Sequence, residues 1–109
     1  QMRGVGIRPN VITYNAAISA CGKCGQWEKA LALLEQMRGV GIRPNVITYN
    51  AAISACTKGG QWEKALGLLV RMPRVGIKPN VITYNAAISA CAKGKQWEKA
   101  LGLLEQMRG

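Results

Sequence analysis

The sequence contains no histidine and no aspartate, and its only acidic residues are five glutamates. A Ser-His-Asp triad, a histidine-based metal site and a histidine general base are therefore all excluded. The glutamates have the spacing of an exposed helix face and form no paired-carboxylate site. They are Glu28, Glu35, Glu63, Glu98 and Glu105. We expect no catalytic residue, no metal site and no cofactor, and an enzyme is the least favoured class.

The chain also lacks an apolar run of membrane-spanning length and a signal or transit segment. Three of its four cysteines, Cys21, Cys56 and Cys91, each end an apolar stripe, so we interpret them as buried free thiols. Free thiols imply a reducing compartment. Cys24 forms a single Cys-Gly-Lys-Cys with Cys21, but a redox or metal role is the weaker interpretation because the chain has no second ligand pair.

What the sequence does contain is one stretch, Val-Ile-Thr-Tyr-Asn-Ala-Ala-Ile-Ser-Ala-Cys, three times at a spacing of 35 residues. We divide the chain into residues 1–10, the tail of a preceding repeat, the complete copies 11–45 and 46–80, and an incomplete copy at 81–109. Because the chain opens in a repeat tail, we expect its native N-terminus to be missing. In such an array each copy buries its apolar residues against its neighbours.

Each copy predicts two helices. In the first copy, Tyr14, Ala17, Ile18 and Cys21 have the i, i+3, i+4, i+7 spacing of a helix with one buried face, and Asn10 occupies the N-cap position. Glycines break the chain before a second helix, expected to open at Gln26. Its apolar stripe is Trp27, Ala30, Leu31, Leu34 and Met37. The short connection between the two predicts an antiparallel pair, so the fold class is an all-α stack of helical hairpins.

Two local features lead to further expectations. Pro73 lies in the second helix of the middle copy, where it removes a backbone donor, so we predict that this helix ends near Arg71 or Met72. Neither end of the array carries a polar capping element, so we expect exposed apolar seams and a tendency to self-associate.

The charge is strongly positive, with 15 Lys and Arg against 5 acidic residues. Every copy is basic, and no basic tail carries the excess. A charge distributed in this way favours a polyanion lying along the array, although solubility alone is the simpler explanation.

The first helix has a second face, which does not face its partner helix. This face carries Ile12 followed by the polar residues Asn15, Ser19 and Lys23, and it recurs in all three copies. Asparagine inside a helix costs up to about 0.7 kcal/mol relative to alanine, so Asn15, Asn50 and Asn85 need an explanation. A bond to a neighbouring copy and a ligand contact are about equally good explanations from the helix alone.

Asn45 and Asn80 are explained by N-capping, yet a cap that starts one hairpin lies close to the first helix of the copy before it. Asn45 can thus approach Asn15, and two amides could share one nucleobase edge. The isoleucines on this face are ordinarily core residues, but a base could also wedge between them. The lysines are ordinarily solvated, but their common position suits a phosphate track.

At this point the unit resembles the pentatricopeptide repeat (PPR) family. The likeness rests on the 35-residue period, Val-Ile-Thr-Tyr-Asn, Gln-Trp-Glu-Lys-Ala-Leu and Gly-Ile-Arg/Lys-Pro-Asn, and it covers the whole chain. It implies a right-handed α-solenoid that binds single-stranded RNA with one base per repeat. It also implies RNA processing or stabilisation in a plastid or mitochondrion.

The resemblance assigns roles to residues of this sequence. Base-reading pairs fall on Asn15 with Asn45 and on Asn50 with Asn80, while Asn85 opens a third pair whose partner lies beyond Gly109. The base-sandwiching residues are Ile12, Ile47 and Ile82, and the phosphate-contacting residues are Lys23, Lys58 and Lys93. An Asn-Asn pair resembles the family combination that prefers pyrimidines, cytosine over uracil.

Two alternatives remain. A tetratricopeptide-like array would bind peptides, but the period and the missing Trp-x2-Leu-Gly-x2-Tyr pattern speak against it. A designed scaffold would explain the 27 identities among 35 positions of the first two copies, but a designer would hardly choose Pro73 or an unpaired Cys24. We favour a fragment of a natural, recently duplicated array.

Overall fold

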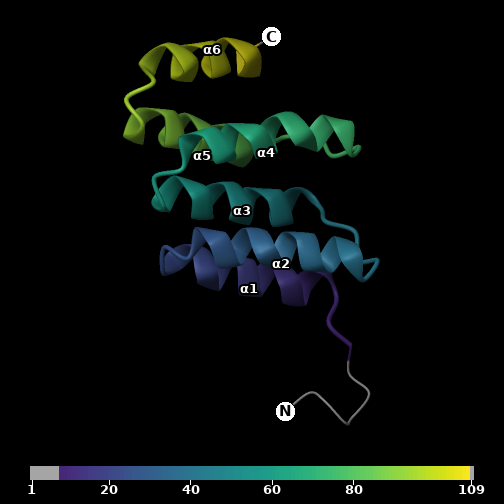
Figure 1. Cartoon of the computed structure of the whole chain (residues 1–109). Coiled ribbons are helices and arrows are strands. Elements are labelled where there is room, and N and C mark those ends of the chain that lie inside the picture. Colours follow the sequence, from purple (N-terminus) through teal and green to yellow (C-terminus); the bar gives the residue numbers. More distant parts are fainter. Residues whose placement is uncertain (1–7, 109) are drawn as a thin grey trace.

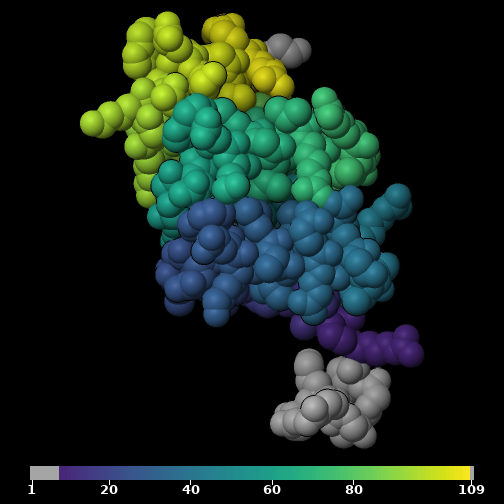
Figure 2. Space-filling model, in the orientation of Figure 1, coloured from purple at the N-terminus to yellow at the C-terminus, as the bar shows by residue number. Residues whose placement is uncertain are grey.

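The computed structural model describes residues 8–108, which form six α-helices and no strand. The helices are α1 (Val11–Lys23), α2 (Trp27–Gly39), α3 (Val46–Lys58), α4 (Trp62–Arg74), α5 (Val81–Lys93) and α6 (Trp97–Arg108). They pair as three antiparallel hairpins that follow one another along the long axis of a body measuring 51 × 28 × 18 Å (Figures 1 and 2). The all-α solenoid expected from the sequence is confirmed.

A capping box starts the first helix of every hairpin. At α3 the Thr48 backbone N–H donates to Asn45 Oδ1 at 3.1 Å, and the Asn45 backbone N–H donates to Thr48 Oγ1 at 3.0 Å. The same reciprocal bonds join Asn10 to Thr13 and Asn80 to Thr83. Each cap is worth about 1 kcal/mol, which matters for helices of 13 residues that are marginal alone.

Each hairpin turn contains a residue in the left-handed region. Gly25 and Gly60 have φ of 74° and 73°, whereas the third copy places Lys95 there with φ of 59°. The turn closes when the Gln61 backbone N–H donates to the Cys56 carbonyl at 2.8 Å. The second helices begin at tryptophan, one residue after the predicted start at Gln26.

Pro73 does not end its helix, so the prediction of an end near Arg71 or Met72 is wrong. Helix α4 continues to Arg74 with Pro73 inside its last turn. A proline so close to the helix end removes only one intrahelical hydrogen bond. The bond that is lost is the one that a backbone N–H at position 73 would donate to the Leu69 carbonyl, and the bonds of later residues are unaffected. The turn beyond the helix is held as in the first copy: the Ile77 N–H donates to the Met72 carbonyl at 2.9 Å.

The first helices form the inner layer of the stack. Helix α1 packs on α3 and α3 packs on α5, whereas no Cα atom of α2 comes within 8 Å of one in α4. Gly22 allows this close approach, since a Cβ on it would lie 3.1 Å from the Ala55 Cβ. Because the first helices are closer together than the second ones, we place them on the concave side of the curved array.

Apolar side chains fill the junctions between hairpins. Tyr49, Ile53 and Cys56 of the middle copy are fully buried, together with Leu34 and Met37 of α2. The middle copy has neighbours on both sides, which explains why its residues are the most completely buried. The core is thus a row of junctions, as an array of hairpins requires.

Tryptophan and glycine connect successive copies on the outer layer. The Trp27 ring packs so closely on Gly59 that a Cβ there would lie 2.2 Å from its Cδ1 atom, and Trp62 occupies the same position on Gly94 at 2.3 Å. Lys64 Nζ lies 5.5 Å from the centroid of the Trp27 ring, close enough for a cation–π contact. Trp97 has no following copy to cover it and is 66% exposed.

Candidate nucleic-acid interface

Asparagines of adjacent copies meet on the inner layer. Asn15 Nδ2 in α1 donates to Asn45 Oδ1 at 3.3 Å, although the two residues are 30 positions apart. Thr48 lies between them, and its hydroxyl donates to Asn15 Oδ1. The structure therefore brings Asn15 and Asn45 together, as expected from their positions in the repeat.

The same arrangement recurs one copy later. Asn50 Nδ2 donates to Asn80 Oδ1 at 3.3 Å, and the Thr83 hydroxyl donates to Asn50 Oδ1. Thr48 and Thr83 are fully buried beneath these amides. Asn85, the predicted first member of a third pair, is exposed and has no side-chain hydrogen bond within residues 8–108.

The bonding pattern fixes which polar atoms remain available. Asn45 must present Oδ1 to the Thr48 backbone N–H, because the reverse orientation would place two donors face to face. Asn15 must then turn its Nδ2 toward Asn45 and its Oδ1 toward the Thr48 hydroxyl. Asn45 Oδ1 accepts two bonds and Asn15 Oδ1 accepts one, so the pair offers mainly amide N–H donors to a ligand. Thr48 sets this arrangement, and its role was not predicted from the sequence. The pattern Asn-x-x-Thr, a variant of the capping box, could have predicted it.

Exposed isoleucines accompany the asparagines. Ile12, Ile47 and Ile82 are 72%, 59% and 59% exposed. An exposed apolar residue at the same place in three copies is unusual for packing and provides a repeated apolar surface beside the amides.

The charge on the inner layer is entirely positive. Each first helix contains one charged residue, its final lysine. All five glutamates lie in the second helices, α2, α4 and α6. Lys23, Lys58 and Lys93 are exposed. Within residues 8–108 the ion pairs involve only residues of α2, α4 and α6. The inner layer therefore attracts anions without competition from nearby carboxylates.

The cysteines are free thiols with different environments. Cys56 and Cys91 are buried, Cys21 is half-buried and Cys24 is exposed. Burial raises the pKa of the Cys56 thiol to about 11. In the described part of the chain no group of three potential ligands is placed to hold a metal ion. Its helices are too short and too polar to cross a membrane.

Taken together, the stacked helical hairpins define an α-solenoid that repeats an asparagine, an exposed isoleucine and a lysine on the same layer of each copy. Comparison with family models identifies the class more closely. Residues 9–58 and 44–93 match the PPR repeat family model, and residues 82–109 match the PPR repeat model. The chain belongs to the PPR repeat family.

Solved structures share the fold. The pentatricopeptide repeat protein PPR10 from maize superposes with a TM-score of 0.85 and 32% identity over 94% of this chain. PPR10 in complex with an 18-nt psaJ RNA element gives a TM-score of 0.85 at 28% identity over 95% of this chain. In both cases the match spans 15% of the PPR10 chain.

A more distant structure supports the fold alone. The PPR domain of Arabidopsis thaliana protein-only RNase P 1, in complex with tRNA, has a TM-score of 0.76 at 21% identity, covering 94% of this chain and 53% of that one. Comparison with curated protein sequences gave no match.

Proposed function

We propose that this chain binds single-stranded RNA along α1, α3 and α5, with one base at each amide pair. The observation that carries this proposal is the Asn15–Asn45 contact and its repetition as Asn50–Asn80, 35 residues later. A ligand that fits must itself repeat at regular intervals, carry negative charge and present polar edges. PPR10 was solved with an RNA element, which supports RNA as that ligand.

The available donors favour cytosine over uracil. Each amide pair offers mainly N–H groups, because Asn45 Oδ1 accepts from both the Thr48 backbone N–H and Asn15 Nδ2, and Asn15 Oδ1 keeps one lone pair beside its bond from the Thr48 hydroxyl. Cytosine presents two adjacent acceptors, N3 and O2, on its Watson–Crick edge, whereas uracil places an N–H between its two acceptors. A row of donors therefore matches cytosine better, and an unmatched N–H costs about 1–3 kcal/mol when buried.

The isoleucines and lysines complete the proposed site. A base held by Asn50 would lie between Ile47 and Ile82, whose exposed side chains can cover its two faces. Lys58, at the end of α3, would contact the phosphate backbone. Asn85, with Ile82 and Lys93, would begin a third position.

For the protein as a whole we propose organellar RNA processing or stabilisation in a plastid or mitochondrion, as its family implies. We also propose self-association through α6, whose Trp97, Leu101 and Leu104 are exposed.

Titration of the chain with fluorescent oligo-C and oligo-A RNA at low salt tests the proposal. We expect weak but measurable binding with preference for oligo-C. Equal affinity for the two would contradict the base-reading role, and binding to neither would contradict RNA binding. Peptide capture that persists without RNA would instead favour a peptide-binding array.

A further inference from the structure

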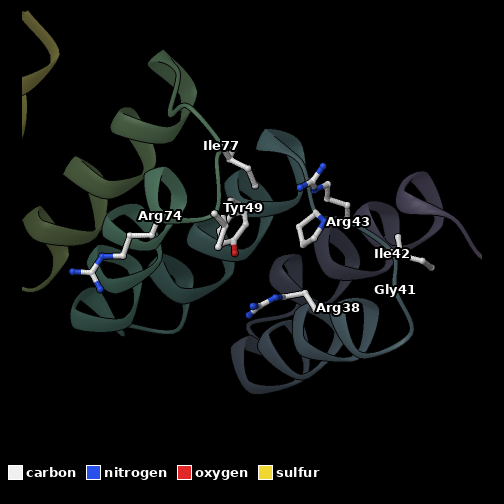
Figure 3. A pocket seen from close by; sticks show the side chains of 9 residues that line it. Arg38, Gly41, Ile42, Arg43, Tyr49, Arg74 and Ile77 are labelled. Carbon is white, nitrogen blue, oxygen red and sulfur yellow. The ribbon is translucent and has the colours of Figure 1, made fainter.

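A second polar site lies between the first two hairpins and uses none of the residues proposed to read bases. A cavity of about 510 Å³ is enclosed by the ends of α2 and α4 and the loops that follow them. Its polar lining consists of Arg38, Arg43, Arg74 and Tyr49, and Ile42 and Ile77 provide apolar walls (Figure 3).

The hydroxyl of Tyr49 is directed toward this cavity from just beneath its surface and has no hydrogen-bond partner (Figure 3). Tyr49 is fully buried, so the unmet hydroxyl is costly, about 1–3 kcal/mol. The equivalent tyrosines are satisfied: Gln36 Nε2 donates to the Tyr14 hydroxyl at 3.1 Å, and Gln106 Nε2 donates to that of Tyr84 at 3.3 Å. The middle copy alone leaves its tyrosine open.

Sequence differences between the copies explain why. Arg71 stands where the other copies have Gln36 and Gln106, and it turns away to bind Glu35 at 3.0 Å. Arg74 stands where the first copy has Gly39. Both changes add positive charge, and the first also replaces the glutamine that donates to the tyrosine hydroxyl in the other copies.

The next junction does not have these properties. The cavity beside Tyr84, of about 580 Å³, is lined by Pro73 where the first junction has Arg38, by apolar side chains that include Val70 and Leu103, and by a single cation, Lys99. The Tyr84 hydroxyl there already accepts a hydrogen bond from Gln106 Nε2. Three arginines beside an unpaired tyrosine hydroxyl thus occur together at the first of these two junctions and not at the second.

The charge of the first cavity is largely uncompensated. Glu35, which pairs with Arg38 at 3.4 Å, is shared with Arg71 at 3.0 Å. Within the described residues Arg43 and Arg74 form no ion pair. The Arg38–Glu35 contact is long and exposed, so it is easily exchanged for a better anion.

We propose that this cavity binds a phosphate-class oxyanion, with the Tyr49 hydroxyl as donor at its base and the guanidinium groups of Arg38, Arg43 and Arg74 around it. A tetrahedral anion can accept from donors on several sides, and arginine is suited to such recognition. Arg38 points toward the space below the Tyr49 oxygen, whereas the side chains of Arg43 and Arg74 extend away from that oxygen (Figure 3). Both would change rotamer to contact the anion. Burial raises the pKa of Tyr49, which keeps its hydroxyl protonated and able to donate.

Isothermal titration with sodium phosphate, against sodium chloride at matched ionic strength, tests the site directly. We expect saturable phosphate binding that rises in affinity as salt is lowered. Tyr49→Phe removes only the unpaired hydroxyl, and Arg74→Gly restores the residue of the first copy; each should weaken phosphate binding about tenfold, the effect of one charge-assisted hydrogen bond. Arg71→Gln should also weaken it, because a glutamine there can occupy the Tyr49 hydroxyl.

Lys29→Gln is the matched control, since it removes one positive charge from the exposed surface of α2 outside the cavity. It should leave phosphate affinity within about twofold, the range of a screened surface charge. Absence of saturable binding, unchanged affinity in Tyr49→Phe, or an equal loss in Lys29→Gln would overturn the proposal. Because Tyr49→Phe removes an unsatisfied group, misfolding is not expected, and its circular dichroism and unfolding temperature verify this.

Adding oligo-C RNA to the phosphate-bound chain distinguishes the two sources of such an anion. If RNA displaces phosphate, the cavity binds a phosphate group of the RNA backbone. If phosphate is retained, the cavity binds a free anion, and either result supports an anion site. The inference stands independently of base reading. Asn50→Ala should abolish base preference at its position while leaving phosphate binding intact, so failure of one proposal is distinguishable from failure of the other.

Discussion

Asn15 donates to Asn45 across the boundary between two copies, at 3.3 Å, and Thr48 holds both amides in place. A single copy contains only half of each proposed binding position. The helix that carries Asn15 and the cap that carries Asn45 are joined only when the next hairpin is stacked, so the proposed recognition depends on the packing of the array.

Replacing Asn50 should change the base preferred at the middle position. In Asn50→Thr a shorter side chain with a hydroxyl that both donates and accepts replaces an amide donor, and we expect the preference to move from pyrimidine toward purine. Affinities for RNA oligonucleotides that differ only at one position measure this. Ser54→Ala, one turn further along α3, serves as the control; a preference unchanged in Asn50→Thr would remove Asn50 from the base-reading role.

Thr48→Val should affect stability and base discrimination together. Valine preserves the shape but removes the hydroxyl that caps α3 and orients Asn15. We expect a loss of about 1–2 kcal/mol in the free energy of unfolding and reduced discrimination between cytosine and uracil.

Thr13→Val provides the comparison for that change. Thr13 makes the same capping bonds with Asn10, but no asparagine of a preceding helix contacts it among residues 8–108. It should lose similar stability without altering base preference. Equal effects of the two variants on discrimination would show that Thr48 acts only as a cap.

Lys58→Ala should weaken binding of all RNA sequences about equally. Removing one phosphate contact reduces the slope of log affinity against log salt by about 0.7 for a single strand. Fluorescence anisotropy at several salt concentrations measures the slope. Lys29→Ala removes the same charge from α2 and should change the slope much less; a sequence-dependent loss in Lys58→Ala would contradict a backbone contact.

Lys95→Gly should stabilise the chain. Lys95 occupies a left-handed turn position, φ of 59°, that the other copies fill with Gly25 and Gly60. Relief of the Cβ clash is worth about 1–2 kcal/mol, partly offset by the greater freedom of glycine in the unfolded chain. Thermal unfolding measures the change. Gly60→Lys is the reverse experiment and should lower the unfolding temperature; stabilisation in that variant would refute the argument.

Alkylation should separate the thiols. Cys24 is exposed, whereas burial raises the pKa of Cys56 from 9.0 to about 11. At pH 8 iodoacetamide should modify Cys24 first and Cys56 only on unfolding, which mass spectrometry of timed samples would detect. The folded state binds the Cys56 proton more tightly than the unfolded chain, so this thiol's contribution to stability is complete below pH 9 and is lost between pH 9 and 11. A pH-independent stability across that window would contradict it.

The sequence predicted much of this architecture because each local signal agreed with the others. Helix starts followed from Asn before an apolar stripe, and the approach of Asn45 to Asn15 followed from the period. Their role in reading bases stays a prediction. The end of α4 was not predictable from Pro73, because a proline in the last turn costs one bond while the following loop supplies new ones. The Tyr49 hydroxyl lacks a hydrogen-bond partner because the Arg71 side chain is oriented toward Glu35 of the neighbouring copy. That orientation could not be predicted from the sequence of one copy.

The tryptophan and glycine contacts give the array a direction. Each copy bears a projecting ring at one end and needs a recess without a Cβ at the other, as Trp27 finds at Gly59. The first copy has Cys24 at the place of that recess. A second molecule bringing its Trp97 to this end would meet a side chain where the ring must lie. The self-association proposed through α6 is therefore not expected to repeat the geometry of the internal junctions.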